Sequence, residues 1–183
     1  MGRCLHPLRL SPRTGGFWQF TADLSLKDSA YTSLALAAHT DNTYFTDPAG
    51  LQTFHMLSHT NGNGGASLLV DGSRAAKILR SESPDAFNDL CKIRTNAHSS
   101  GNEGISIMPQ QFFPVLVTKE GAPGLPEDVT QIRWNNDDRA TLPAHEPEDV
   151  KRFYIAARKW VEILRRPDSE YWVQLTPGKV LSE

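Results

Sequence analysis

Short strand-like segments, most of them followed by glycine- or proline-rich turns, run along most of this 183-residue chain. Runs of four to eight residues rich in Thr, Tyr, Leu, Val and aromatic side chains are typical of strands, and Gly, Pro, Asn and Asp between them mark turns. Many strands with irregular spacing favour an antiparallel sandwich or barrel. The segments that we expect to be strands are 31–38, 51–57, 67–70, 93–98, 112–118, 129–134, 171–175 and 179–181.

Helical patterns interrupt the strands. After residue 72 apolar residues recur at helix spacing, and Ser83 followed by Pro84 is typical of an N-cap with proline at the first helical position. A longer apolar stripe follows Pro147 and ends at Arg166. We therefore expect a mainly β fold with helices inserted or packed outside. The stripe consists of Val150, Phe153, Tyr154, Ala157, Trp160, Val161 and Leu164.

Composition limits the kinds of partner. The formal net charge is −2 and no dense Lys/Arg cluster occurs, so nucleic acid is not expected as a partner. No apolar run approaches the roughly 20 residues that cross a bilayer, so no membrane span is expected. Only Cys4 and Cys91 are present, which argues against a disulfide scaffold or a structural zinc site. A small molecule is the expected partner.

The first sixteen residues are basic and contain no acid. This composition is shared by mitochondrial transit peptides and by ordinary basic tails. Pro7 and Pro12 would interrupt an amphipathic helix, which favours the tail. Both a mitochondrial and a cytoplasmic location are compatible with this pattern.

His39 and Asp41 are the pair of residues with the clearest chemical meaning. On a strand, residues i and i+2 face the same side about 6.6 Å apart along the chain, so both side chains could reach one ion. Iron(II) in the 2-His-1-carboxylate arrangement takes such a pair together with a distant histidine. The alternative is a histidine hydrogen-bonded at a strand end beside an Asp that caps a turn, and spacing alone favours that alternative.

The sequence around this pair decides between the two interpretations. Residues 15–72, from GGFWQF to LLVDG, resemble the trimethyllysine dioxygenase branch of the 2-oxoglutarate- and iron-dependent oxygenases. The resemblance continues through IRWNNDDRA at 132–140, the helix that ends in RRP, and YWVQLTPGKVL at 171–181. Several motifs thus occur in the order and at the spacing of that family.

The resemblance implies a double-stranded β-helix, or jelly roll, for residues 15–183, incomplete at the C-terminus, preceded by a divergent tail of residues 1–14. It also implies that His39 and Asp41 bind Fe(II), that 2-oxoglutarate chelates the metal, and that a C–H bond is hydroxylated with O2, with ascorbate as a supporting reductant. Ser67, after the Gly64-Gly65 turn, matches the position that holds the 2-oxoglutarate carboxylate.

Substrate recognition follows from the same resemblance. A quaternary ammonium donates no hydrogen bonds and is usually surrounded by aromatic faces, sometimes with a carboxylate. Trp18 and Tyr31 match such a cage and Asp28 its acidic partner, where the related γ-butyrobetaine branch carries Asn. The Asp favours trimethyllysine as substrate. The residues that match a stretch lining the substrate side are Asn135, Asn136 and Arg139.

The implied reaction converts trimethyllysine to 3-hydroxy-trimethyllysine, the first intermediate of carnitine biosynthesis. The family also uses a distal histidine and an arginine in a DNxRxLHGR-like segment beyond PGxVL, whereas this sequence ends at Glu183. We expect none of the other histidines to replace the missing ligand: His55, His59, His98 and His145.

The 183-residue chain is therefore expected to have little or no activity by itself. Two alternatives stay open. One is a non-catalytic truncated isoform that associates with the full-length enzyme, and the other is a γ-butyrobetaine hydroxylase. A homo-oligomer is possible.

Overall fold

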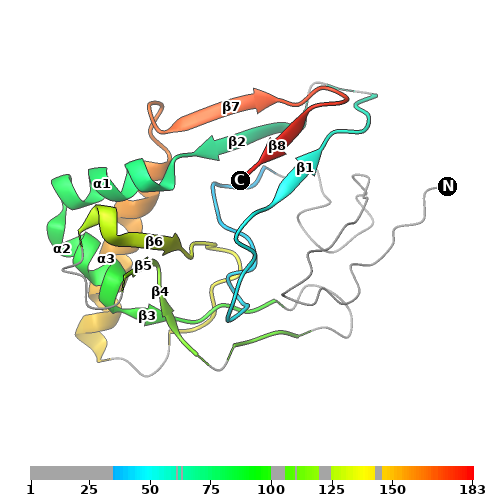
Figure 1. The fold of residues 1–183 in the computed structure, drawn as a ribbon. Coiled ribbons are helices and arrows are strands. Elements are labelled where there is room, and N and C mark those ends of the chain that lie inside the picture. Colours follow the sequence, from blue (N-terminus) through cyan, green and yellow to red (C-terminus); the bar gives the residue numbers. More distant parts are fainter. Residues whose placement is uncertain are drawn as a thin grey trace.

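Three helices form one side of the molecule (Figure 1). The structure is a computed structural model that describes residues 35–60, 62, 64–99, 106–109, 111–119, 125–142 and 146–183. Helix α1 spans Gly72–Glu82, α2 spans Pro84–Lys92 and α3 spans Pro147–Leu164. Each helix contacts the other two. The domain boundary predicted near residue 14 and the expected residues Trp18, Asp28 and Tyr31 lie outside the described residues.

The helices begin where the sequence predicted. The Asp71 side chain caps α1 by accepting a hydrogen bond from the backbone N–H of Arg74 at 2.9 Å. Pro84 and Pro147 begin α2 and α3, where the missing N–H of proline costs nothing. Ser83 makes no side-chain cap bond to α2, and its backbone N–H instead closes α1 on the carbonyl of Leu79.

The hydrophobic core lies between the helices and the adjoining strands β5 (Leu116–Thr118) and β6 (Val129–Ile132). Its fully buried side chains come from all three helices and from the segment that includes β5. Burying such residues is the main source of stability in a domain of this size. The largest of them are Trp160, Phe87, Phe153, Leu79, Leu90, Leu116, Ile163 and Val115.

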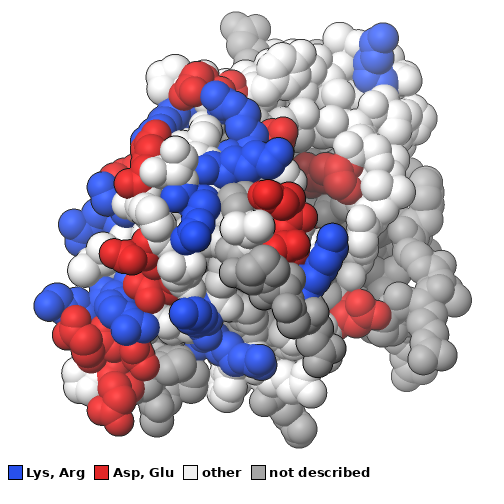
Figure 2. Space-filling view, turned by 60° about the vertical axis from the view of Figure 1, so that its left-hand side comes forward, with Lys and Arg blue, Asp and Glu red and all other residues white. Residues whose placement is uncertain are grey.

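Charged side chains of both signs alternate over the helical face (Figure 2). Arg152 on α3 pairs with Asp89 on α2 at 3.2 Å and with Asp149 on its own helix. Arg166, just past α3, holds both carboxylate oxygens of Glu82 at the end of α1. The ion pairs thus join neighbouring helices. In the part of the chain that is described, no helix is both long and apolar enough to span a membrane.

The strands form four antiparallel pairs. Two pairs lie beyond the helices, on the side where the chain ends (Figure 1). Gly65 and Gly178 adopt φ values of 79° and 85°, as tight turns before β2 and β8 require. The pairs are β1 Thr53–His55 with β8 Val180–Ser182, β2 Ala66–Val70 with β7 Glu170–Gln174, β3 Arg94–Thr95 with β4 Phe113–Pro114, and β5 Leu116–Thr118 with β6 Val129–Ile132; the short 3-10 helix η2 at Pro126–Asp128 precedes β6.

Three details of the predicted elements were wrong. Residues 35–38, the described part of the strand expected at 31–38, form no strand. The strand expected at 112–118 is divided into β4 and β5. Tyr154, expected in the apolar stripe of α3, is 49% exposed, while Ala156 and Ile163 are buried. Its ring lies at the edge of the stripe under the guanidinium of Arg139, 5.1 Å from the ring centre.

Candidate metal centre

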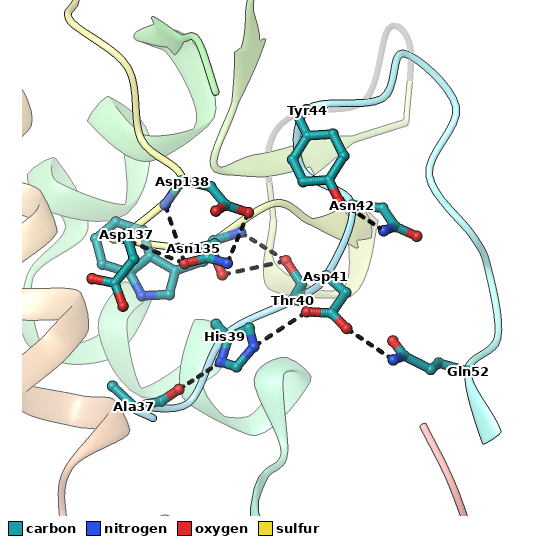
Figure 3. A network of polar contacts seen from close by, with 11 residues as sticks. Ala37, His39, Thr40, Asp41, Asn42, Tyr44, Gln52, Asn135, Asp137 and Asp138 are labelled. Atoms are coloured by element: carbon teal, nitrogen blue, oxygen red, sulfur yellow. Dashed lines mark hydrogen bonds and ion pairs between the residues drawn. The ribbon is translucent and has the colours of Figure 1, made fainter. Parts of the chain in front are cut away.

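His39 and Asp41 point toward each other from an irregular segment (Figure 3). The Nε2 atom of His39 lies 3.2 Å from Oδ1 of Asp41, and the two side chains are 28% and 41% exposed. The segment turns at residues 41–44, so the two side chains converge without the regular strand on which the prediction was based. One nitrogen and one oxygen donor therefore share a half-open site.

Each of these two side chains has a second partner on its outer side (Figure 3). Nδ1 of His39 lies 2.7 Å from the carbonyl oxygen of Ala37, so this nitrogen carries the proton and donates it. The Nε2 amide of Gln52 donates to Oδ2 of Asp41 at 2.8 Å. The outer partners occupy Nδ1 of His39 and Oδ2 of Asp41, so Nε2 of His39 and Oδ1 of Asp41 are the atoms that face each other.

The electrostatics of the pair favour the ionised carboxylate. The hydrogen bond to Asp41 raises the pKa of His39 to about 9, against an opposing effect of burial. The hydrogen bond from His39 lowers the pKa of Asp41, and the Gln52 amide adds to this effect. Burial and then the charge of Asp41 raise the pKa of the nearby Asp138 carboxyl. In the absence of a metal, His39 and Asp41 thus form an ion pair near neutral pH.

Two sets of contacts hold residues 40–45 against Arg133 and Trp134, which directly follow β6. The backbone N–H of Thr40 donates to the carbonyl of Trp134 at 2.7 Å, and the Thr40 hydroxyl accepts from the Trp134 N–H at 2.9 Å. The buried guanidinium of Arg133 donates to the carbonyls of Thr43 and Phe45. The turn after Asp41 is therefore anchored by a side chain from the core.

The donor set fits a divalent ion that prefers nitrogen and oxygen. Adjacent ligands of an octahedral ion with bonds of about 2.1 Å lie about 3.0 Å apart, which is close to the separation of Nε2 and Oδ1. A hydrogen bond from the outer nitrogen of a ligating histidine to a carbonyl is the usual support of such a site. The residues present thus fit two positions of a metal site.

A third protein ligand does not come from the described residues, in which no group of three or more His, Cys, Asp or Glu side chains could hold a metal ion. His59 instead lies 3.2 Å from the carbonyl oxygen of Gly64, and His55 lies on the exposed strand β1. His145 lies outside the described residues.

Of the three residues expected on the substrate side, Asn136 and Arg139 contact each other, whereas the side chain of Asn135 makes its bonds elsewhere. Asn135 directly follows Trp134, which is bonded to Thr40 between His39 and Asp41. The side chain of Asn135, however, is bonded within its own turn to Asp137 and Asp138. The guanidinium of Arg139 lies over the rings of Phe153 and Tyr154 of α3. Its guanidinium also donates to the side chain of Asn136 at 3.2 Å.

Ser67, expected to hold 2-oxoglutarate, lies on β2 opposite Val173 of β7 and is half-buried. Gly65, just before this strand, has the positive φ that the Gly64-Gly65 turn requires. The turn expected before Ser67 is therefore present.

Three residues near the pair were not identified from the sequence: Gln52, Arg133 and Asp138. Gln52 precedes a short strand and matches no metal-binding motif. Asp138 belongs to a stretch, NNDD, that is typical of an ordinary turn. Arg133 occurs inside a predicted strand. This position was the only sequence signal for its contacts, because a buried guanidinium needs hydrogen-bond acceptors.

The sequence matches the family described as "Taurine catabolism dioxygenase TauD, TfdA family" over residues 5–182. It is 46% identical to the trimethyllysine dioxygenase of Neurospora crassa, over 91% of this chain and 41% of that protein. It is 40% identical to the mitochondrial trimethyllysine dioxygenase of Bos taurus, over 91% of this chain and 39% of that protein. The gamma-butyrobetaine dioxygenase of Homo sapiens is 26% identical over 92% of this chain and 42% of that protein.

The chain thus spans about two-fifths of the length of the curated relatives that it matches.

Proposed function

The chain belongs to the taurine catabolism dioxygenase TauD, TfdA family, and we propose that it is part of an enzyme that hydroxylates trimethyllysine with Fe(II), 2-oxoglutarate and O2. The observation that carries the proposal is the convergence of His39 Nε2 and Asp41 Oδ1 at 3.2 Å, each with its own outer hydrogen-bond partner. The product would be 3-hydroxy-trimethyllysine, with succinate and CO2 formed from 2-oxoglutarate.

His39 and Asp41 hold the iron in this proposal. His39 binds as the neutral imidazole, because its Nδ1–H is fixed on the Ala37 carbonyl and the Nε2 lone pair faces the site. Asp41 binds as the carboxylate, whose ionised form the surrounding hydrogen bonds favour. Bound Fe(II) supplies the redox chemistry that activates O2. We propose that Ser67 contributes to holding the 2-oxoglutarate carboxylate.

Trimethyllysine is the proposed substrate rather than γ-butyrobetaine. The support is the identity of 46% and 40% to trimethyllysine dioxygenases, against 26% to a gamma-butyrobetaine dioxygenase. Trp18 and Tyr31 would surround the trimethylammonium group, and Asp28 would balance its charge. The residues proposed to meet the amino-acid end are Asn135, Asn136 and Arg139.

We propose a double-stranded β-helix for residues 15–183. Its support is the nested pairing of the outer strands, since β1 pairs with β8 and β2 with β7, and these two pairs enclose the consecutive pairs β3–β4 and β5–β6 along the chain. A mitochondrial location is supported by the name of the bovine relative. A tail at residues 1–14, a homo-oligomer and a need for ascorbate stay predictions.

One observation favours a second candidate function. The described residues bring only two ligands together, and no third histidine or carboxylate completes the set among them. A chain with two protein ligands would hold iron weakly and turn over slowly or not at all. Such a chain could instead associate with a longer enzyme of the same family.

The test is an assay of the 183-residue chain with Fe(II), ascorbate, 2-oxoglutarate and trimethyllysine, with mass spectrometry of the amino acid and of succinate. The His39→Ala variant is the control for adventitious iron chemistry. Hydroxylated product that His39→Ala abolishes supports the enzyme. Succinate at the level of His39→Ala, together with co-purification with a trimethyllysine dioxygenase of full length, supports the second candidate. Preference for γ-butyrobetaine would contradict the proposed substrate.

A further inference from the structure

Gln52 joins the segment that carries His39 and Asp41 to the strand pair β1–β8. Its side-chain amide donates to Oδ2 of Asp41 at 2.8 Å (Figure 3). Its backbone N–H donates to the carbonyl of Glu183 at 2.8 Å, and its carbonyl accepts from the Glu183 N–H at 2.9 Å. These two bonds continue the antiparallel ladder of β1 and β8 by one residue pair beyond Thr53 and Ser182.

The amide acts on a specific oxygen of the carboxylate. Because Gln52 occupies Oδ2, only Oδ1 is left to face Nε2 of His39. A carboxylate without this bond could rotate about χ2, whose energy profile is broad and roughly two-fold. The Gln52 bond therefore selects one orientation of the Asp41 carboxylate before an ion binds. The carboxylate then loses less conformational entropy when it binds the ion.

The position of the amide is itself fixed. The Gln52 backbone is bonded twice to the neighbouring strand, and its side chain is half-buried against Asp41. A donor held by the ladder is more effective than one on a free loop, because fewer rotatable bonds remain to be ordered.

We propose that Gln52 is a positioning residue of the metal site, which orients the Asp41 carboxylate and thereby ties metal affinity to the β1–β8 pair. This inference rests on the proposed function, because it takes His39 and Asp41 to be the metal ligands. Outer hydrogen-bond partners of metal ligands typically contribute 10- to 100-fold in metal affinity.

The test is a titration of the 183-residue chain with Mn(II), in which electron paramagnetic resonance measures the free ion. Gln52→Leu keeps the volume and removes the donor, and Gln52→Asn keeps the amide but withdraws it by one methylene. Thr53→Val is the matched control, because the Thr53 hydroxyl contacts the Ser182 hydroxyl at 3.3 Å across the same strand pair but does not touch Asp41. Circular dichroism melts of each variant report any loss of structure.

We expect both Gln52 variants to bind Mn(II) about 10- to 100-fold more weakly than the parent chain, with Thr53→Val unchanged. Parent-like affinity of either folded Gln52 variant would overturn the inference. So would an equal loss in Thr53→Val, because the effect would then come from the strand pair alone. The His39→Ala variant distinguishes failure of the metal site from failure of the role of Gln52. If His39→Ala binds Mn(II) as tightly as the parent chain, the proposed metal site and the inference both fail. If His39→Ala binds Mn(II) more weakly but the Gln52 variants do not, only the role of Gln52 is refuted.

Discussion

His39 Nε2 and Asp41 Oδ1 lie 3.2 Å apart, although the residues that carry them belong to an irregular segment and not to a strand. The two donors meet because the backbone of Thr40, between them, is bonded to Trp134. Without metal the pair is an ion pair, and the same two atoms are the ones that a divalent cation would take. Proton and metal therefore compete for His39.

The first prediction concerns the titration of His39. The bond to Asp41 raises the pKa of His39 to about 9 in the folded chain, above the ordinary value of 6.5. Nuclear magnetic resonance of the imidazole in the metal-free chain should show a midpoint near 9. In Asp41→Asn the midpoint should fall toward the ordinary value, because the carboxylate that favours the imidazolium is gone. A midpoint near 6.5 in the parent chain would show that the ion pair does not form in solution.

The sign of the pH dependence follows from the same shift. A raised pKa in the folded state stabilises the fold fully below about 6.5, and this contribution is lost as the pH rises from there to about 9. The lowered pKa of Asp41 acts at the acidic end, where its contribution is lost as the pH falls through the folded-state pKa. Metal affinity should increase from pH 6.5 to 9, because His39 loses the proton that competes with the metal over this range. A Mn(II) titration at several pH values would measure this increase.

Arg133 gives the second prediction. Its guanidinium is buried, donates to the carbonyls of Thr43 and Phe45, and lies 4.0 Å from the centre of the Phe113 ring. Arg133→Ala should lower the free energy of unfolding by roughly 2–4 kcal/mol, because it removes the donor from the buried carbonyl of Thr43 and the partly buried carbonyl of Phe45.

Arg133→Lys should recover only part of this loss, since an ammonium is not a planar fork. The exposed Arg158 on α3 offers a control whose replacement by alanine should change little. Urea unfolding of the three variants measures the difference, and an Arg133→Ala chain as stable as Arg158→Ala would refute the anchoring role.

The helices and most strands could be predicted from sequence because their signals are local. Asp71, Pro84 and Pro147 mark the helix starts, and the turn glycines precede β2 and β8 as expected. The partners of the strands are not local. Nothing in the sequence of β1 indicates that it pairs with β8, more than a hundred residues later in the chain.

The two faces of α3 give the third prediction. Trp160 is 1% exposed, whereas Ile155 is 49% exposed on the opposite face. Trp160→Ala should destabilise the chain by about 3–5 kcal/mol, because it leaves a large cavity between the helices. Ile155→Ala should stay within about 0.5 kcal/mol of the parent. Thermal or urea unfolding measures both, and similar effects of the two substitutions would contradict the packing of α3.

The fourth prediction concerns β7, which exposes apolar side chains on both of its faces. Tyr171 and Trp172 are adjacent and so point to opposite sides, yet they are 65% and 53% exposed. Apolar strand faces open to water promote association. The double substitution Tyr171→Thr with Trp172→Thr should reduce light scattering and binding of a hydrophobic dye at a given concentration, and Ile155→Thr should not. A parent chain that stays monomeric and binds no dye would contradict this.

The site was only partly accessible to sequence reasoning. The spacing of His39 and Asp41, read together with the family resemblance, identified the pair that the structure brings together. Gln52 could not be found in this way, because its bond to Asp41 depends on how the segment before β1 folds back. Arg139 shows the reverse problem: its position in WNNDDR suggested the substrate side, but its guanidinium lies on the rings of α3.

The most direct test of the account is calorimetric titration of the 183-residue chain with Fe(II) under argon, with His39→Ala, Asp41→Ala and the control His55→Ala, whose histidine lies on the exposed strand β1. We predict one weak iron site that either ligand substitution abolishes and that His55→Ala leaves unchanged. Iron binding of equal strength in the parent, His39→Ala and Asp41→Ala chains would contradict it.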